Sequence, residues 1–234
     1  MLSEINFWRL EDFINNYNYT YLMKLSVPFY ENRGDGNQCM QVTMRSVLKY
    51  FLDKDFSLEE LDKLTGRKNS LWTWTSQVVT VLHDLGLKVK YYSKSDLEPF
   101  LQGEPFIRKH FGKDSEKILK FTDLPVVLES INKLLKYKNN IFEKRKLSFD
   151  EIESHIEQGH VPLMLIDHNK IVEKEGLYQG HFIVVTSFDD QNVFYHESGP
   201  KNPEADKKVP KSTFIDAWNA NGTDNNVVIV YGKK

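Results

Sequence analysis

The chain has 234 residues, of which 40% are hydrophobic and 13% aromatic, and its formal net charge at pH 7 is −2. This length and composition predict a globular protein with a sizeable core and exclude a disordered chain. The small net charge gives no basic surface for nucleic acid. No apolar run approaches the roughly 18 residues of a membrane-spanning helix. We therefore expect neither nucleic acid nor a membrane as partner.

The N-terminal stretch and the cysteine content indicate a compartment. Residues 1–17, MLSEINFWRLEDFINNY, mix acidic with apolar residues and lack the pattern of a signal peptide. The one cysteine, Cys39, cannot form an internal disulfide and fits a reducing environment. We expect a cytoplasmic protein.

Helical periodicity dominates the first part of the chain. One apolar face predicts a helix within residues 1–20, and Ser57 with Glu60 forms the pattern of a capping box. Ser95 and Glu98 repeat that pattern. Helices are expected over residues 1–20, 39–52, 57–66 and 75–86, and a strand over 87–92.

Strand signals dominate the last third. Strands are expected over residues 161–166, 181–188, 193–196 and 227–231, and helices over 124–137, 148–158 and 212–219. Residues 189–192 separate the middle two strands as a hairpin turn. Helices followed by an antiparallel sheet predict the α+β class.

Cys39 is the first candidate for chemistry. It follows the polar loop 30–38 and begins a helix whose buried face includes Met40, Met44 and Val47. Because free N–H groups at a helix N-terminus favour negative charge, a cysteine there tends to have a low pKa. This placement suits a nucleophile. The alternative is a small buried hydrophobic side chain.

A cysteine nucleophile needs a base and a group that orients it. His181 begins a strong predicted strand after a loop, where it would face a cleft, and the other six histidines have weaker settings. Glu197 follows the neighbouring strand, so the two side chains could meet across adjacent antiparallel strands. An edge histidine bonded to backbone and a solvated carboxylate are the plainer interpretations.

The remaining requirement of acyl transfer is an oxyanion donor, usually an amide and the N–H of the nucleophile. Asn32, Asn37 and Gln38 are the amides in the loop before Cys39. We expect no metal, because the spacing of His155 and His160 does not place two ligands on one helical turn and no HExxH motif is present. Without a phosphate-binding glycine loop, no cofactor is expected either.

Several stretches, in order, resemble one family. VPFYENRGDGNQC with its apolar helix, GHFIVVTSFDDQNVFYHESGP and PKSTFIDAW are similar to segments of the papain-like bacteriocin-processing (double-glycine) cysteine peptidases. The resemblance implies a papain-like fold over the single domain 1–234. Its helical half would span about 1–102 and its sheet half about 148–234, with 103–147 as an insertion.

The resemblance also assigns roles. It implies Cys39 as nucleophile, His181 as general base and Glu197 as the orienting acid. The sequence departs from the family pattern at three places: Cys-Met-Gln stands where the family has Cys-Gly-Pro, Glu197 replaces an Asp, and the family's oxyanion Gln has no direct match. Asn32 aligns there with one extra loop residue, and Gln38 could substitute.

These observations predict a cysteine peptidase or amide hydrolase that acts through a thioester on a peptide or amide. Two alternatives remain open. One is a catalytically impaired peptide-binding or regulatory module on the same fold. The other is an acyltransferase that uses the same cysteine.

Overall fold

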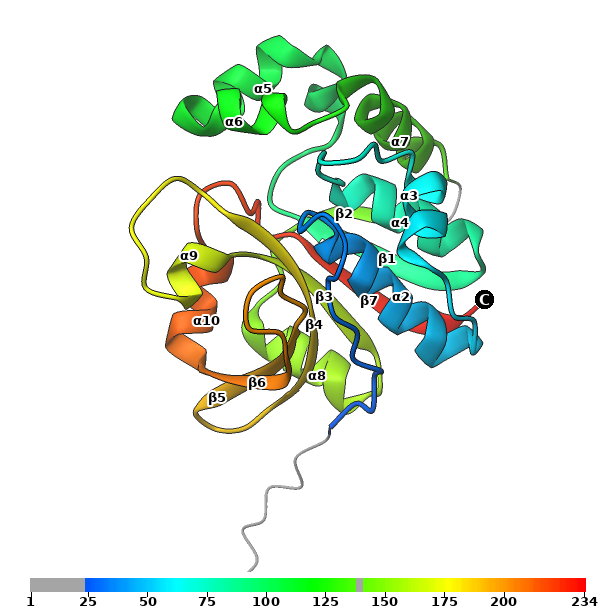
Figure 1. The fold of residues 1–234 in the computed structure, drawn as a ribbon, viewed down its shortest axis with the longest axis vertical. Helices are drawn as coiled ribbons and strands as arrows, with labels where there is room; N and C mark the ends of the chain where they lie inside the picture. The colour runs from blue at the N-terminus through cyan, green and yellow to red at the C-terminus, as the bar shows by residue number, and fades with distance from the viewer. Residues whose placement is uncertain (1–23, 138–140) are drawn as a thin grey trace, which may run out of the picture.

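In the part of the chain that the structure describes, one seven-stranded sheet organises the fold (Figure 1). The structure, a computed structural model, describes residues 24–137 and 141–234. The strands lie in the order β2-β1-β7-β3-β4-β5-β6, and every neighbouring pair is antiparallel except β1 and β2. Their bounds are β1 Leu87–Ser93, β2 Phe142–Lys144, β3 Val161–Asp167, β4 Gly180–Phe188, β5 Asn192–Glu197, β6 Glu204–Pro210 and β7 Val227–Lys233.

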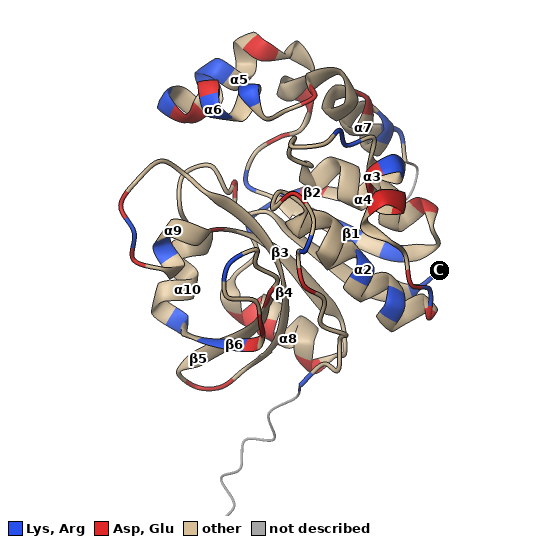
Figure 2. Ribbon diagram, viewed as in Figure 1, with Lys and Arg blue, Asp and Glu red and all other residues tan. Residues whose placement is uncertain are grey.

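Helices precede the first strand and lie between several of the later strands. The α-helices are α2 Cys39–Leu52, α3 Leu58–Thr65, α4 Thr75–Asp84, α5 Glu104–Phe111, α6 Ser115–Lys120, α7 Leu124–Lys136, α8 Phe149–Glu157, α9 His168–Ile171 and α10 Lys211–Trp218. Two 3₁₀ turns are η1 Glu98–Gln102 and η2 Gly112–Asp114. No helix among the described residues is long and apolar enough to cross a bilayer. Helices α3, α5 and α6 each carry both acidic and basic residues (Figure 2).

The α+β class is confirmed, and so are most of the predicted elements. The helix 39–52 matches α2, and the predicted capping box is present, because Ser57 and Glu60 exchange bonds with each other's backbone N–H. The hairpin turn also forms, with Asp189 accepting bonds from Asn192. The helix predicted within 1–20 lies outside the described residues.

Other predictions need correction. The second capping box is wrong: Ser95 bonds to Asp224 instead, and η1 begins only at Glu98. Thr75 is the first residue of α4, not its cap. The strands of the sheet do not all come from the last third of the chain, because β1 lies in the sheet and pairs with β7.

Helix α2 packs against the sheet and forms part of the core. Met44, Val47 and Leu48 of α2 are fully buried, and the helix packs on β4 and β7. The Thr43 hydroxyl donates to the carbonyl of Phe182 over 3.1 Å. This contact fixes the first turn of α2 beside the first residues of β4, where His181 lies.

Candidate active site

Cys39 is the first residue of α2, and the structure brings it against His181. Gln38 is the residue that precedes the helix, and the first turn carries no acidic side chain. Burial raises the pKa of the Cys39 thiol, but the hydrogen bond and charge of His181 and the N–H groups of Phe182 and Met40 outweigh it. The pKa of Cys39 is therefore lowered from its ordinary value.

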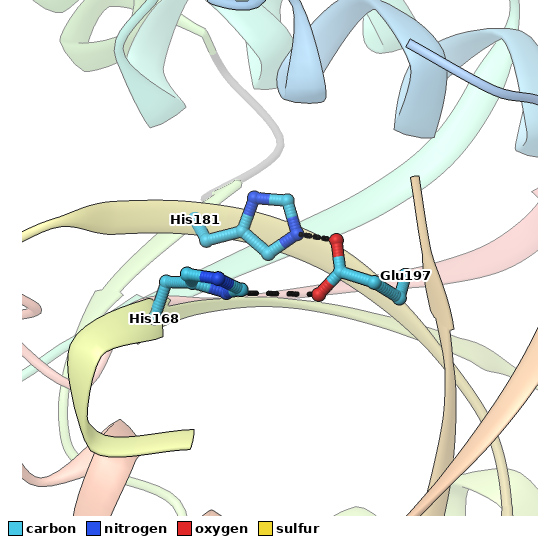
Figure 3. Close-up of side chains that lie close together, drawn as sticks. All are labelled: His168, His181 and Glu197. Carbon is cyan, nitrogen blue, oxygen red and sulfur yellow. Dashed lines mark hydrogen bonds and ion pairs between the residues drawn. The ribbon is translucent and has the colours of Figure 1, made fainter. Parts of the chain in front are cut away.

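His181 links the cysteine to a carboxylate. Its Nε2 lies 2.8 Å from Oε1 of Glu197, which leaves Nδ1 for the thiol (Figure 3). Burial lowers the pKa of His181, but the hydrogen bonds to Cys39 and Glu197 and the charge of Glu197 raise it to about 10. The lowered thiol pKa and the raised imidazole pKa together favour a thiolate beside an imidazolium.

Glu197, the last residue of β5, is 1% exposed. Burial raises the pKa of its carboxyl, while His181, the N–H of Gly199 and the charge of His168 lower it, and the net shift is downward. Its Oε2 has no hydrogen-bond partner among the described residues and faces Nδ1 of His168 at 3.6 Å (Figure 3). Glu197 thus lies between two histidines.

His168 was not singled out from the sequence, although the sheet register explains its position. It follows the end of β3, and β3 pairs with β4 so that Ile166 lies opposite His181. Burial and the charge of His181 lower the pKa of His168, which favours its neutral form. Among the described residues, ligand atoms of His168, His181 and Glu197 lie within 4.8 Å of one another and could hold a cation.

The two predicted oxyanion donors have different surroundings. The carboxamide of Gln38 bonds to Asp62 over 2.7 Å and packs against Gly34. The Asn32 side chain is buried with neither polar atom partnered among the described residues. The Asn32 N–H donates to the carbonyl of Ser198, the residue after Glu197, over 2.7 Å. Asn32 is therefore an unpartnered amide beside the site, whereas the Gln38 carboxamide is already bonded to Asp62 and packs within the loop.

A buried guanidinium holds the loop that precedes Cys39. Arg67 pairs with Asp35 and with Asp62, the latter over 2.9 Å, and its Nε donates to a backbone carbonyl. Its side chain is 1% exposed. Because Asp62 also accepts from Gln38, the network reaches the residue before the nucleophile candidate.

Replacing Arg67 with Met should lower the free energy of unfolding by about 3–5 kcal/mol, because two carboxylates would lose a buried partner. Denaturant unfolding measures this loss. Arg45→Met is the matched control, since its pair with Asp55 is more exposed and should contribute about 1 kcal/mol or less. Equal losses in the two variants would contradict a special role for the Arg67 network.

A cleft of about 590 Å³ opens beside these residues. Cys39, His181 and Glu197 line it, together with His168 and Tyr178. Sequence reasoning missed Tyr178, which lies three residues before His181 in the segment interpreted only as a loop. Asn32 and Gln38 are not among the lining residues.

Three solved structures are similar to this chain. A C39-like peptidase from Bacillus anthracis superposes with a TM-score of 0.50 over 89% of this chain and 96% of that chain, at 11% identity. The peptidase domain of Streptococcus ComA, a bifunctional ABC transporter of quorum sensing, gives 0.47 over 88% and 98%, at 12% identity. A double-glycine motif protease from an AMS/PCAT transporter, solved with its leader peptide, gives 0.46 over 88% and 93%, at 13% identity.

The resemblance expected from the sequence is thus confirmed at the level of the fold. The family comparison adds a second name, because residues 35–230 match the model of a family described as "Guanylylate cyclase". This match spans both the Cys39 helix and the strands that carry His181 and Glu197. The chain belongs to the family described as guanylylate cyclase, and it has the papain-like fold of the C39 peptidases.

Proposed function

We propose that the protein is a cysteine hydrolase that cleaves a peptide or amide bond through a thioester. The observation that carries this proposal is the continuous chain of contacts from Cys39 through His181 to the buried Glu197. A lowered thiol pKa and a raised imidazole pKa at adjacent groups are what a thiolate nucleophile requires.

In the acylation step, Sγ of Cys39 attacks the carbonyl carbon while the carbonyl oxygen becomes an oxyanion. The Cys39 N–H stabilises that charge, and Asn32 and Gln38, which do not line the cleft, are given no part in this step. The C–N bond then breaks, and His181 gives its proton to the departing amine. Water attacks the thioester with His181 as base, the carboxylic acid is released, and Cys39 returns to the thiolate. Glu197 orients the imidazole throughout.

The family name points to a different reaction. In cyclisation of a nucleoside triphosphate, the 3′ oxygen attacks the α-phosphorus and pyrophosphate leaves, so no protein thiol takes part. The ion pair of Cys39 and His181 would then have no role. This contrast favours acyl transfer over cyclisation for the site.

Cys39→Ala should abolish both alkylation by iodoacetamide at pH 6 and hydrolysis of p-nitrophenyl acetate, because no other thiol is present. Mass spectrometry and release of p-nitrophenol measure the two losses. Ester hydrolysis that survives in the variant at the wild-type rate would contradict the proposal. Cyclic GMP formation from GTP, unchanged by Cys39→Ala, would support the cyclase instead.

An added amine decides between hydrolysis and acyl transfer to another acceptor. If water is the acceptor, the free carboxylic acid remains the main product in the presence of millimolar glycinamide and in the absence of hydroxylamine.

We further propose that the protein works in a reducing compartment such as the cytoplasm, since oxidation of Cys39 would remove the nucleophile.

A further inference from the structure

The cleft beside Cys39 continues into an apolar chamber. One end carries Cys39 and His181, and the other is lined by side chains of β1, η1 and helices α5 to α7. Figure 1 shows α5 and α6 standing opposite α9 and the connection between β3 and β4. The apolar lining residues from this segment are Leu97, Phe100, Phe111, Ile118 and Ile131.

Aromatic contacts join side chains in the wall of the chamber. Trp72 stacks on Phe121 with ring centroids 5.1 Å apart, and Trp74 meets the edge of Phe100 at 5.8 Å. The indole N–H of Trp74 is already bonded to Thr122 over 3.0 Å. Trp74 therefore offers the cleft mainly apolar ring surface.

Tyr178 contributes an unpartnered donor to the same cleft. The residue is 9% exposed, and its hydroxyl has no hydrogen-bond partner among the described residues. A Cβ at Gly180 would lie 2.7 Å from that hydroxyl, and a Cβ at Gly222 would lie 2.9 Å from the ring. The two glycines thus make room for the phenol. Burial raises the pKa of Tyr178, so the hydroxyl keeps its proton.

An unpartnered buried hydroxyl costs free energy unless a ligand completes its bond. Asn226, which lines the cleft and is 9% exposed, likewise has an unpartnered Oδ1 among the described residues. Of the three lysines that line the cleft, Lys174 and Lys201 are exposed and Lys207 is half-buried. The interior therefore fits a ligand that is apolar over most of its surface and carries a few polar atoms.

We propose that the chamber binds a large apolar acyl group of the substrate, and that the Tyr178 hydroxyl donates a hydrogen bond to a substrate oxygen near the scissile bond. This inference rests on the proposed hydrolase. The acyl group stays on Cys39 while the amine leaves, so a chamber continuous with the thiol can hold it through both steps. The volume of about 590 Å³ lies within the range of pockets that enclose a small-molecule ligand.

The chain-length dependence of ester hydrolysis tests the chamber. p-Nitrophenyl acetate, butyrate and hexanoate share one leaving group and differ only in the acyl chain. Burial of each added methylene should raise kcat/KM by about fourfold. Equal kcat/KM values for the three esters, all dependent on Cys39, would overturn the inference and leave the hydrolase standing.

A substitution that fills part of the chamber tests whether the acyl group binds there. Ile131→Phe narrows the chamber and should reduce the ratio of hexanoate to acetate hydrolysis at least tenfold. Leu134→Phe is the matched control, because Leu134 is equally buried on α7 but does not line the cleft. The ratio is measured within each protein, so partial unfolding of either variant cancels. An unchanged ratio in Ile131→Phe would place the acyl group elsewhere.

Tyr178→Phe removes only the hydroxyl. We expect kcat/KM to fall about tenfold for all three esters alike, with the chain-length ratio kept. A change confined to KM for hexanoate would show that Tyr178 only shapes the chamber, and unchanged rates would show that its hydroxyl does not contact the substrate.

A binding measurement separates failure of this inference from failure of the hydrolase. Hexanamide and acetamide are titrated into the Cys39→Ala variant, and the readout is the tryptophan fluorescence, to which Trp72 and Trp74 contribute. Hexanamide should bind at least 50-fold more tightly. If hydrolysis is absent but hexanamide binds in this way, the chamber is an apolar binding site without the proposed chemistry. If neither amide binds, the inference is wrong whatever the hydrolase assay shows.

Discussion

His181→Ala should slow alkylation of Cys39 by iodoacetamide at pH 6 by about 100-fold. Without the imidazolium, burial dominates and the pKa of the thiol rises, so a much smaller fraction is thiolate at that pH. The greater intrinsic reactivity of a more basic thiolate recovers only part of the loss. The measurement is the alkylation rate of both proteins from pH 5 to pH 9.

The control is His155→Ala, since His155 contacts His160 and Tyr231 and not the cysteine. Its alkylation profile should match that of the wild type. A wild-type rate that rises only above about pH 8, and that His181→Ala leaves unchanged, would identify Cys39 as an inert core residue. The binding or regulatory module would then be the better interpretation.

The same ion pair sets an upper pH limit. Because the pKa of His181 is raised to about 10 in the folded protein, the stability it contributes is complete below its ordinary pKa of about 6.5. That contribution is lost as the pH rises through about 10. Amide hydrolysis should fall over the same range, because the departing amine needs the imidazolium proton.

Glu197→Gln should reduce kcat/KM by roughly 10²- to 10⁴-fold. The amide keeps the shape of the side chain but removes the charge that orients His181 and stabilises its cation, which is the role of the acid in comparable triads. Two of the interactions that raise the pKa of His181 come from Glu197, so its pKa should also fall. The upper pH limit of hydrolysis should therefore shift downward.

Glu204→Gln is the matched control for this substitution. Glu204 lies opposite Glu197 in the register of β5 and β6, but it is exposed. It should change kcat/KM by less than about twofold. Activity retained in Glu197→Gln, or lost equally in both variants, would contradict the orienting role of Glu197.

The sequence predicted the elements that carry strong periodicity. The apolar stripe after Cys39 is a 3.6-residue pattern on a buried helix, and the apolar run after His181 is a strand covered on both faces. Strand β6 was not predicted, because its residues, EADKKVP, are mostly charged and exposed at the sheet edge. Its stability comes from pairing with β5, which local periodicity does not reveal.

The contacts of the site depended on information that the sequence does not carry directly. His181 and Glu197 were expected on adjacent strands, and the structure puts them 2.8 Å apart. The partner of Gln38 was not foreseeable, because Asp62 reaches it from α3, 24 residues away. Likewise, the helices of 103–147 line the cleft only because tertiary packing folds them over it.

The central place of β7 has a consequence for the order in which the protein can assemble. β7 is the last strand of the chain, yet it lies between β1 and β3, and it pairs Lys88 with Gly232. Such distant pairings form slowly, and synthesis from the ribosome delivers β7 after every other strand. Until β7 pairs, no strand joins β1 and β2 to β3 and β4. The sheet therefore becomes continuous only when its two parts meet across β7, in a late step of folding.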